Sequence, residues 1–224
     1  MTIGFRILPR TRCVSPEIVS SFSKLPVANV SDSMWRMTAG GASLRPMHKE
    51  GVLAGPALTV KTRPGDNLML HKAIALAAPG DTIVCDAGGD LTNALVGEMM
   101  LAQMVKRRVA GLVINGAIRD LAAIAAQTMP VYAAGVTHRG PYKNGPGEIN
   151  VSIAIDGMVI EPGDLILGDE DGLLCVPFDQ VEDVLARARA KFAAERRQMA
   201  NIEAGTHDAS WVDAALREQG CEGL

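Results

Sequence analysis

The sequence is poor in cysteine: its 224 residues include four cysteines, and these lie far apart. No C-x-x-C pair and no histidine-rich spacing accompanies them, which argues against a zinc knuckle and against a disulfide framework. Cys85 and Cys175 stand inside apolar runs, where a small buried side chain is the expected role. The pattern favours reduced thiols, and we expect a cytoplasmic protein.

Long hydrophobic runs and an excess of charge are also lacking. No stretch of the chain approaches the roughly 18 uninterrupted apolar residues of a membrane span. The first residues, "MTIGFRILPRTRCV", lack the apolar centre of a secretory signal. The formal net charge is -3, which does not favour binding to nucleic acid or to an anionic membrane. We therefore expect neither a membrane nor a nucleic acid as a partner.

Aromatic residues make up only 4% of the chain, so alanine, valine, leucine and eleven methionines supply most of the apolar volume. Docking against other subunits would add apolar contacts to such a core. No internal repeat and no low-complexity linker divides the sequence. We interpret residues 1–224 as a single domain with terminal extensions.

Strand and helix patterns alternate through the centre of the sequence. Residues 82–89 ("TIVCDAGG"), 111–115 and 129–135 have strand patterns; residues 93–108 and 118–127 are predicted as helices. This alternation predicts parallel strands joined by right-handed crossovers. After residue 148, short strands and Asp-Gly or Pro-Gly turns predict antiparallel pairs, followed by a long helix over about 178–203.

Two strand ends carry the residues that indicate a functional site. Each combines glycines, which let a ligand approach the backbone, with the start of a predicted helix. The polar residues at these ends are Asp86, Asp90 and Glu98 after one strand and Asn115, Arg119 and Asp120 after the next. If the two strands are neighbours, these groups meet in one cleft. Such a cleft suits a small carboxylate held by arginine, backbone amides and a hard divalent cation.

Each of these residues also has an ordinary structural interpretation. Asp120 in a first helical turn is stabilised by the helix dipole without any ligand, and Arg119 and Glu98 could face water. Glycines after a parallel strand often serve only the turn. Only the combination of groups at two adjacent strand ends favours a site.

The motifs also resemble those of a known family. "GEMM" at 97–100 and "GAIRD" at 116–120 stand together with "AGPALTVKTRPGDNLMLHKAI", "IVCDAGGDLTNALVGE" and "IEPGDLILGDEDGLLCVP". Together they resemble the RraA-like family over roughly residues 26–205. This family includes the class II 4-hydroxy-4-methyl-2-oxoglutarate / 4-carboxy-4-hydroxy-2-oxoadipate aldolases. The resemblance implies an α/β fold, a swivelling β/β/α-type αββα sandwich with mixed parallel and antiparallel strands.

The resemblance also implies roles for individual residues. Arg119 would bind a small 2-oxo acid, and Asp120 would ligate Mg²⁺ or Mn²⁺. The backbone amides of the GEMM segment would hold the substrate carboxylate; they belong to Gly97, Glu98, Met99 and Met100. Glu98 would contact the metal through water, as would Glu195 from a neighbouring subunit of a trimer or hexamer. Asn115 and the loop 138–151 depart from the family pattern, which leaves the exact substrate open.

The implied reaction is a metal-dependent carbon–carbon cleavage. A 2-oxo acid of the 4-hydroxy-4-methyl-2-oxoglutarate type would be cleaved to pyruvate, and oxaloacetate decarboxylation would pass through the same enolate. The expected base is a water oriented by Glu98 or Glu195. Removal of Arg119 or Asp120 should abolish both reactions.

Three alternatives remain open at this point. Lys61 could form a Schiff base with the substrate instead, although a strand lysine more often extends to the surface. His71 follows "PGDN", and its side chain either reaches the cleft or packs against a neighbouring helix. A non-enzymatic regulator that binds the endoribonuclease RNase E is the main alternative function. The regulators of this family depart from the Arg-Asp pair, which this chain keeps, so the enzyme is favoured.

Overall fold

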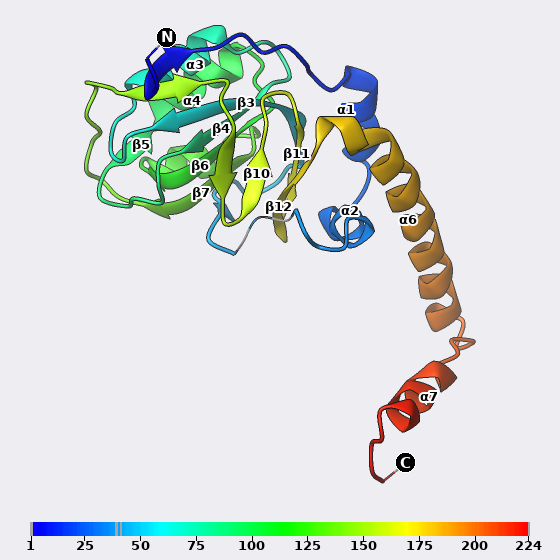
Figure 1. Ribbon diagram of the computed structural model, residues 1–224. Helices are drawn as coiled ribbons and strands as arrows, with labels where there is room; N and C mark the ends of the chain where they lie inside the picture. Colours follow the sequence, from blue (N-terminus) through cyan, green and yellow to red (C-terminus); the bar gives the residue numbers. More distant parts are fainter. Residues whose placement is uncertain (1, 39, 41, 224) are drawn as a thin grey trace.

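A computed structural model describes residues 2–38, 40 and 42–223 of the chain, and its centre is a set of parallel strands (Figure 1). The strands are β3 (Leu53–Thr62), β4 (Thr82–Asp86), β6 (Gly111–Ile118) and β7 (Val131–Val136). They lie in the order β3-β4-β6-β7, and each pairs in parallel with the next. The predicted parallel arrangement is confirmed, and β4 and β6 are neighbours.

Antiparallel strands complete a mixed sheet. Both β8 and β11 pair antiparallel with β3, β12 pairs antiparallel with β11, and β2 does so with β7. A separate antiparallel hairpin joins β9 to β10 through the predicted Asp156-Gly157 turn. The bounds of the remaining strands are β1 (Phe5–Ile7), β2 (Arg45–Pro46), β5 (Ala94–Val96), β8 (Gly147–Ile149), β9 (Ile153–Ile155), β10 (Met158–Ile160), β11 (Leu165–Asp169) and β12 (Gly172–Val176).

Seven α-helices lie among the described residues. They are α1 (Pro16–Phe22), α2 (Val27–Ser33), α3 (Leu68–Leu76), α4 (Glu98–Lys106), α5 (Leu121–Ala125), α6 (Val181–Glu203) and α7 (Ser210–Glu218). A short 3-10 helix, Phe178–Gln180, precedes α6, so the long helix predicted over about 178–203 is confirmed.

The alternation of side chains along the strands separates the molecule into four layers. In β4, Ile83 and Cys85 join the apolar cluster that includes residues of α3 and α4, whereas Val84 joins the cluster shared with β9 and β10. In β11, Leu165 packs with residues of α1, α2 and α6, whereas Ile166 belongs to the same cluster as Val84. Because successive residues of a strand point to opposite faces, the order is helices, sheet, sheet, helices. This is the predicted αββα sandwich.

Two of the predicted helices were wrong in extent. Residues 93–108 form β5 and then α4, because Ala94–Val96 pair in parallel with the end of β6. Residues 118–127 contain only the short helix α5, since Ile118 still belongs to β6. Both differences place residues 97–98 and 119–120 at junctions between a strand and a helix, where a ligand can reach the backbone.

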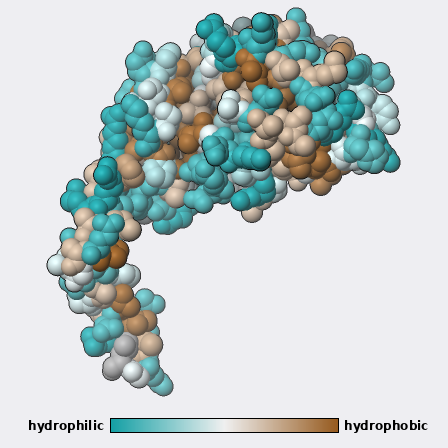
Figure 2. Space-filling model, turned by 180° about the vertical axis from the view of Figure 1, so that it is seen from behind, coloured by the Kyte–Doolittle hydropathy of each residue, from teal (hydrophilic) through white to brown (hydrophobic). Residues whose placement is uncertain are grey.

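The C-terminal part of α6 and the chain that follows it leave the body of the molecule. Helix α6 begins against α1 and α2 and then projects outward, with α7 at its far end (Figure 1). Figure 2 shows this arm with hydrophobic residues on its surface, and Trp211, Val212 and Leu216 of α7 are exposed. Within the described part of the chain, no helix is both long and apolar enough to span a bilayer.

Candidate active site

A cavity of about 310 Å³ opens where β5 and β6 end and α4 begins. Four segments line it: the start of α3, the stretch from Ala94 to Met100, the pair Arg119 and Asp120, and a loop with Pro141 and Lys143. The side chains of Arg119 and Asp120 remain 45% and 39% exposed, so a ligand can reach them from solvent. The carboxyl edge of a parallel sheet is the place where ligands bind in open α/β folds.

Asp120 joins the two strand ends. Its carboxylate oxygen Oδ2 accepts a hydrogen bond from the backbone N–H of Glu98 at 3.1 Å and lies 3.7 Å from Nε of Arg119. The backbone N–H of Arg119 donates to the carbonyl of Val96 at 2.9 Å. The structure therefore brings residues 97–98 and 119–120 together, as the two strand ends predicted.

The backbone of Asp120 has an unusual conformation. Its φ is +58° and its ψ is +40°, the left-handed region that few residues other than glycine adopt. Asp120 precedes α5 as its N-cap, yet its side chain makes no capping hydrogen bond to that helix. The carboxylate turns toward the start of α4 instead. Asp120 therefore starts α5 without capping it, and a conformation that costs of order 1–3 kcal/mol directs the carboxylate to the start of α4, which lines the cavity.

Gly97 permits this close approach. A Cβ atom placed on Gly97 would overlap Oδ2 of Asp120 and lie 3.1 Å from Nε of Arg119. The φ of Gly97 is -135°, which any residue can adopt, so the requirement for glycine here is steric. The amides of Met99 and Met100, in the first turn of α4, meet no acceptor among the described residues. A helix start with free amides is suited to bind a carboxylate.

The donor set fits a hard divalent cation that keeps most of its water. Within the described ranges, no three His, Cys, Asp or Glu side chains converge on one point. The carboxylates that line the cavity are those of Glu98 and Asp120. Mg²⁺ is usually held by one or two carboxylates together with waters and oxygens of the substrate. The residues present therefore match Mg²⁺ or Mn²⁺ and do not match a structural zinc site.

Three further polar residues from α3 and the loop line the cavity. Asn67, just before α3, is buried; its Nδ2 donates to the carbonyl of Leu95 at 2.8 Å, but its Oδ1 meets no hydrogen-bond partner. His71 is half-buried, and burial together with the charge of Lys143 lowers its pKa. The open question about His71 is thereby answered, because its side chain reaches the cleft. Sequence reasoning missed Asn67 and Lys143, although it marked the loop 138–151.

This loop is fastened at both of its ends. The amide of Ala94 donates to the carbonyl of Arg139 at 2.8 Å, and Asn93 Nδ2 donates to the carbonyl of Gly140. At the other end, the buried carboxylate of Asp66 accepts a hydrogen bond from the amide of Asn144 at 2.8 Å. The residues between these two attachments, Lys143 among them, are therefore held beside the cavity.

The other strand-end residues do not reach the cavity. Nδ2 of Asn115 donates to Oδ1 of Asp86 at 2.9 Å, and the amide of Gly88 donates to the same oxygen at 3.0 Å. Asp90 accepts a hydrogen bond from the hydroxyl of Thr92 at 2.8 Å. The prediction that Asp86, Asp90 and Asn115 share one cleft with Arg119 was wrong, because these groups bond to one another and to their own turn.

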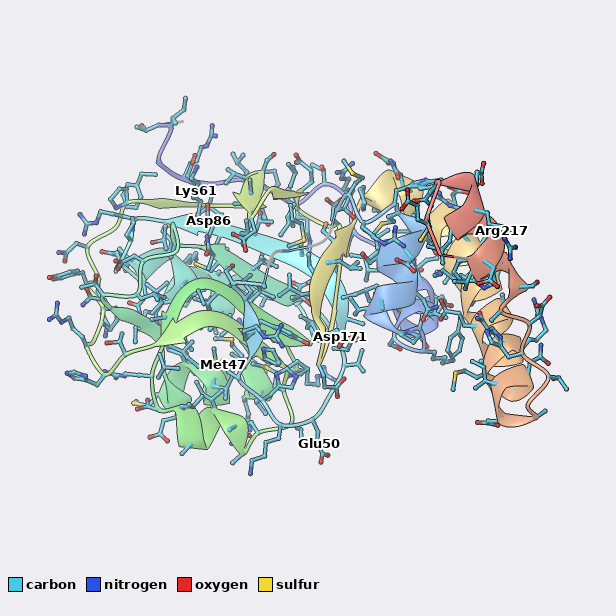
Figure 3. The ribbon with its side chains drawn as sticks, turned by 90° about the horizontal axis from the view of Figure 1, so that it is seen from below. Met47, Glu50, Lys61, Asp86, Asp171 and Arg217 are labelled. Carbon is cyan, nitrogen blue, oxygen red and sulfur yellow. The ribbon has the colours of Figure 1, made fainter. Side chains whose placement is uncertain are left out.

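Lys61 also lies outside the cavity. Lys61 and Asp86 form the last residue pair between β3 and β4, and Figure 3 shows the two residues at the same edge of the sheet. Lys61 lines a different, smaller cavity together with Gly4, Arg63 and Glu148. A Schiff-base role would require the lysine in the cavity that holds Arg119, so the structure argues against it.

Glu195 lies on α6, away from the cavity of its own chain. Nδ2 of Asn29 and Nζ of Lys191 both donate to its carboxylate, and these hydrogen bonds lower its pKa. Lys191 also pairs with Asp32 of α2 at 3.0 Å. Within one chain Glu195 contributes to the packing of α6 on α2, and its predicted role in a neighbouring subunit stays a prediction.

Known proteins share both the sequence and the fold of this chain. The profile of the RraA-like family (Aldolase/RraA) matches residues 27–175. A protein of Halalkalibacterium halodurans, provisionally named 4-hydroxy-4-methyl-2-oxoglutarate aldolase, is 40% identical over 177 residues, which are 79% of this chain and 84% of that protein.

Two solved structures show the same architecture. An uncharacterized protein from Pseudomonas syringae pv. tomato str. DC3000 superposes with a TM-score of 0.78 at 25% identity, covering 88% of this chain and 93% of its own. The RNA-processing inhibitor RraA from Thermus thermophilis has a TM-score of 0.64 at 28% identity, over 68% of this chain and 92% of its own.

Proposed function

The chain belongs to the RraA-like family, and from that membership and its cavity we propose that it is a lyase, an aldolase that releases pyruvate from 4-hydroxy-2-oxo acids. The proposed substrate is an acid of the 4-hydroxy-4-methyl-2-oxoglutarate type, the substrate named for the relative that is 40% identical. One observation carries the proposal: Asp120, Arg119 and the free amides at the start of α4 surround one open cavity.

The cavity offers one partner for the carboxylate and another for the adjacent keto group of a 2-oxo acid. The amides of Met99 and Met100 would receive the substrate carboxylate, and the guanidinium of Arg119 would receive the keto oxygen. Asp120, with Glu98 acting through water, would hold Mg²⁺ or Mn²⁺. The cation, when bound, supplies Lewis-acid polarisation of the keto group. Arg119 would then stabilise the negative charge that develops on the enolate oxygen.

The same arrangement would support two reactions. Cleavage of the C3–C4 bond in the hydroxy acid leaves pyruvate enolate, and loss of carbon dioxide from oxaloacetate leaves the same enolate. Both depend on the groups that stabilise the enolate, which are Arg119 and the cation at Asp120. We therefore propose oxaloacetate decarboxylation as a second activity of this cavity.

We propose further that the active protein is a homo-oligomer, a trimer or a hexamer. Helix α6 projects from the body and carries Glu195 with a side chain that is 44% exposed. A neighbouring copy could receive this carboxylate at its own cavity, where it would contact the metal through water. Size-exclusion chromatography with light scattering tests the oligomer, and a monomer with full activity would contradict it.

A second candidate function is regulation of RNA processing without catalysis. The 28% identity to the RNA-processing inhibitor RraA favours it. The enzyme is the better supported of the two because Arg119, Asp120 and Glu98 line one cavity, which a purely protein-binding role does not require.

Pyruvate release is the experiment that separates these functions. The purified protein is given 4-hydroxy-4-methyl-2-oxoglutarate or oxaloacetate, with Mg²⁺ or with EDTA, and pyruvate is measured by a coupled assay. We expect release that requires the cation. Release that persists in EDTA, together with covalent trapping by borohydride, would favour a lysine, and no release with either substrate would contradict the proposal.

A further inference from the structure

Helix α3 forms one wall of the cavity. None of the groups proposed to bind the carboxylate and the keto group of the 2-oxo acid lies on this wall. Helix α4 contacts α3 and also contacts α5, which follows directly on Asp120. The start of α4 is therefore flanked by Arg119 and Asp120 on one side and by α3 on the other. Asn67 and His71 lie one helical turn apart, so both present their side chains on the face of α3 toward the cavity.

His71 has the environment of a proton acceptor. Its imidazole is half-buried, and neither ring nitrogen meets a hydrogen-bond partner among the described residues. Burial and the positive charge of Lys143 lower its pKa below the ordinary value of an imidazole, which favours the neutral ring that can accept a proton. The charged groups around it come from α4, the β6–α5 junction and the loop; they are Glu98, Lys106, Arg107, Arg119, Asp120 and Lys143.

The length of the substrate directs its far end to this wall. The carboxylate carbon and the keto carbon of a 2-oxo acid are adjacent, and the amides of α4 and Arg119 would hold both. The carbon that bears the hydroxyl lies two bonds beyond the keto carbon, outside the reach of those groups. The neighbouring wall, with His71 and the unpaired Oδ1 of Asn67, is the place that remains for this hydroxyl.

We propose that His71 is a catalytic residue that accepts the proton of the C4 hydroxyl when the C3–C4 bond of the substrate breaks. The inference rests on the proposed aldolase function and deepens it. The proton moves from the hydroxyl oxygen to the imidazole, the C4–O bond becomes a carbonyl, and the electron pair of the C3–C4 bond passes into the pyruvate enolate. The enolate takes a proton from water at C3, and the imidazolium returns its proton to water as the products leave.

Oxaloacetate provides an internal reference for this step. Its decarboxylation forms the same enolate but has no C4 hydroxyl to deprotonate. Loss of His71 should therefore slow cleavage of the hydroxy acid and spare decarboxylation. A loss of general-base catalysis typically lowers a rate by about 10²- to 10⁴-fold.

The test compares His71→Gln with the wild-type protein and with His207→Gln, which changes an exposed histidine beyond α6. We measure kcat and KM for 4-hydroxy-4-methyl-2-oxoglutarate cleavage, oxaloacetate decarboxylation, and exchange of the pyruvate methyl protons in D2O. For His71→Gln we expect kcat of cleavage to fall about 10²-fold or more, with KM, decarboxylation and exchange changed less than about 3-fold. His207→Gln should match the wild type.

The pH profile supplies a second readout. In the wild type, kcat of cleavage should fall as pH decreases through the lowered pKa of His71, because the protonated ring cannot accept a proton. This acid limb should disappear in His71→Gln. Equal loss of all three activities, or cleavage that stays within about 3-fold, would overturn the role of His71. If the wild type cleaves no hydroxy acid at all, the proposed function fails instead.

Discussion

The ends of β4 and β6 have similar sequences, but their carboxylates have different hydrogen-bond partners. Each end combines a glycine with a carboxylate, and the two strands lie side by side. At β4, the carboxylate of Asp86 accepts hydrogen bonds from Asn115 and from Gly88, and it stays in its own turn. At β6, the left-handed backbone of Asp120 turns the carboxylate to the neighbouring α4. The carboxylate of Asp86 is thus held within its own turn, whereas that of Asp120 lies in the cavity, where a ligand can reach it.

The largest expected effect comes from removing the exposed carboxylate or the arginine beside it. Asp120→Ala and Arg119→Ala should each lower kcat of pyruvate release by about 10²- to 10³-fold, because the developing enolate charge loses its stabilisation. Asp86→Ala is the matched control from the neighbouring strand and should stay within about 3-fold. Equal losses in the Asp86 and Asp120 variants would break the distinction between the two strand ends.

Gly97→Ala should have the next largest effect. The added methyl group would overlap Oδ2 of Asp120, so the carboxylate must move from its position beside the amide of Glu98. A displacement of about 1 Å in an active site can cost about 10²-fold in rate, and we expect a loss of that order in kcat. The measurement is kcat together with the thermal midpoint. A variant with normal activity would show that this position of the carboxylate is not required.

Asp66 is a third carboxylate that follows a strand of the sheet, here β3, and it makes the stability of the protein depend on pH. Burial raises its pKa, but hydrogen bonds from the amides of Leu68, Asn144 and Gly145 and the charge of Arg63 outweigh burial and lower it overall. A lowered folded-state pKa stabilises the protein above the unfolded-state pKa, and this contribution is lost as pH falls through the folded-state value. Asp66→Asn should therefore unfold more easily at pH 7.

The difference between Asp66→Asn and the wild type should shrink as the wild-type carboxylate becomes protonated below about pH 4. Urea unfolding at pH 7, 4 and 3 measures this. A difference in unfolding free energy that does not change with pH would assign the effect to packing and not to charge.

The smallest expected effect is at Asn115. Asn115→Ala removes the partly buried hydrogen bond to Asp86, which should lower the free energy of unfolding by about 1 kcal/mol. For a chain of this size, the thermal midpoint should fall by roughly 2–4 °C. Pyruvate release should remain within about 3-fold of the wild type, since the pair lies outside the cavity. A large loss of activity with unchanged stability would place Asn115 in the active site after all.

Much of the architecture could be predicted because it depends on periodic patterns. The alternation of strand and helix patterns through the centre of the sequence predicted parallel strands, and the Asp-Gly and Pro-Gly turns predicted the antiparallel pairs. The start of α4 could not be found in this way, because Ala94, Leu95 and Val96 fit a helix as well as a strand. These residues form a strand because they pair with the end of β6, and a local sequence pattern does not reveal this pairing.

The site was also predicted only in part, because a local pattern reveals some of its residues and not others. Gly97, Glu98, Arg119 and Asp120 were identified from their place at strand ends and from the family resemblance, and the structure brings them together. Lys143 was missed because it lies on a loop that Asp66 and Asn93 hold beside the cavity. Asn67 was missed because its side chain is held at the cavity by a hydrogen bond to the carbonyl of Leu95, 28 positions further along the chain. Such long-range hydrogen bonds have no signature in the order of the residues.

The hydrogen bond from Glu98 to Asp120 also makes the cavity sensitive to partial opening of the molecule. It spans 22 positions in the chain and encloses the whole of α4. Separation of β5 from β6 would pull the amide away from the carboxylate, although the two other layers of the sandwich stay packed. The protein should consequently lose activity on mild heating before its secondary structure melts, and a ligand bridging the two residues would protect it.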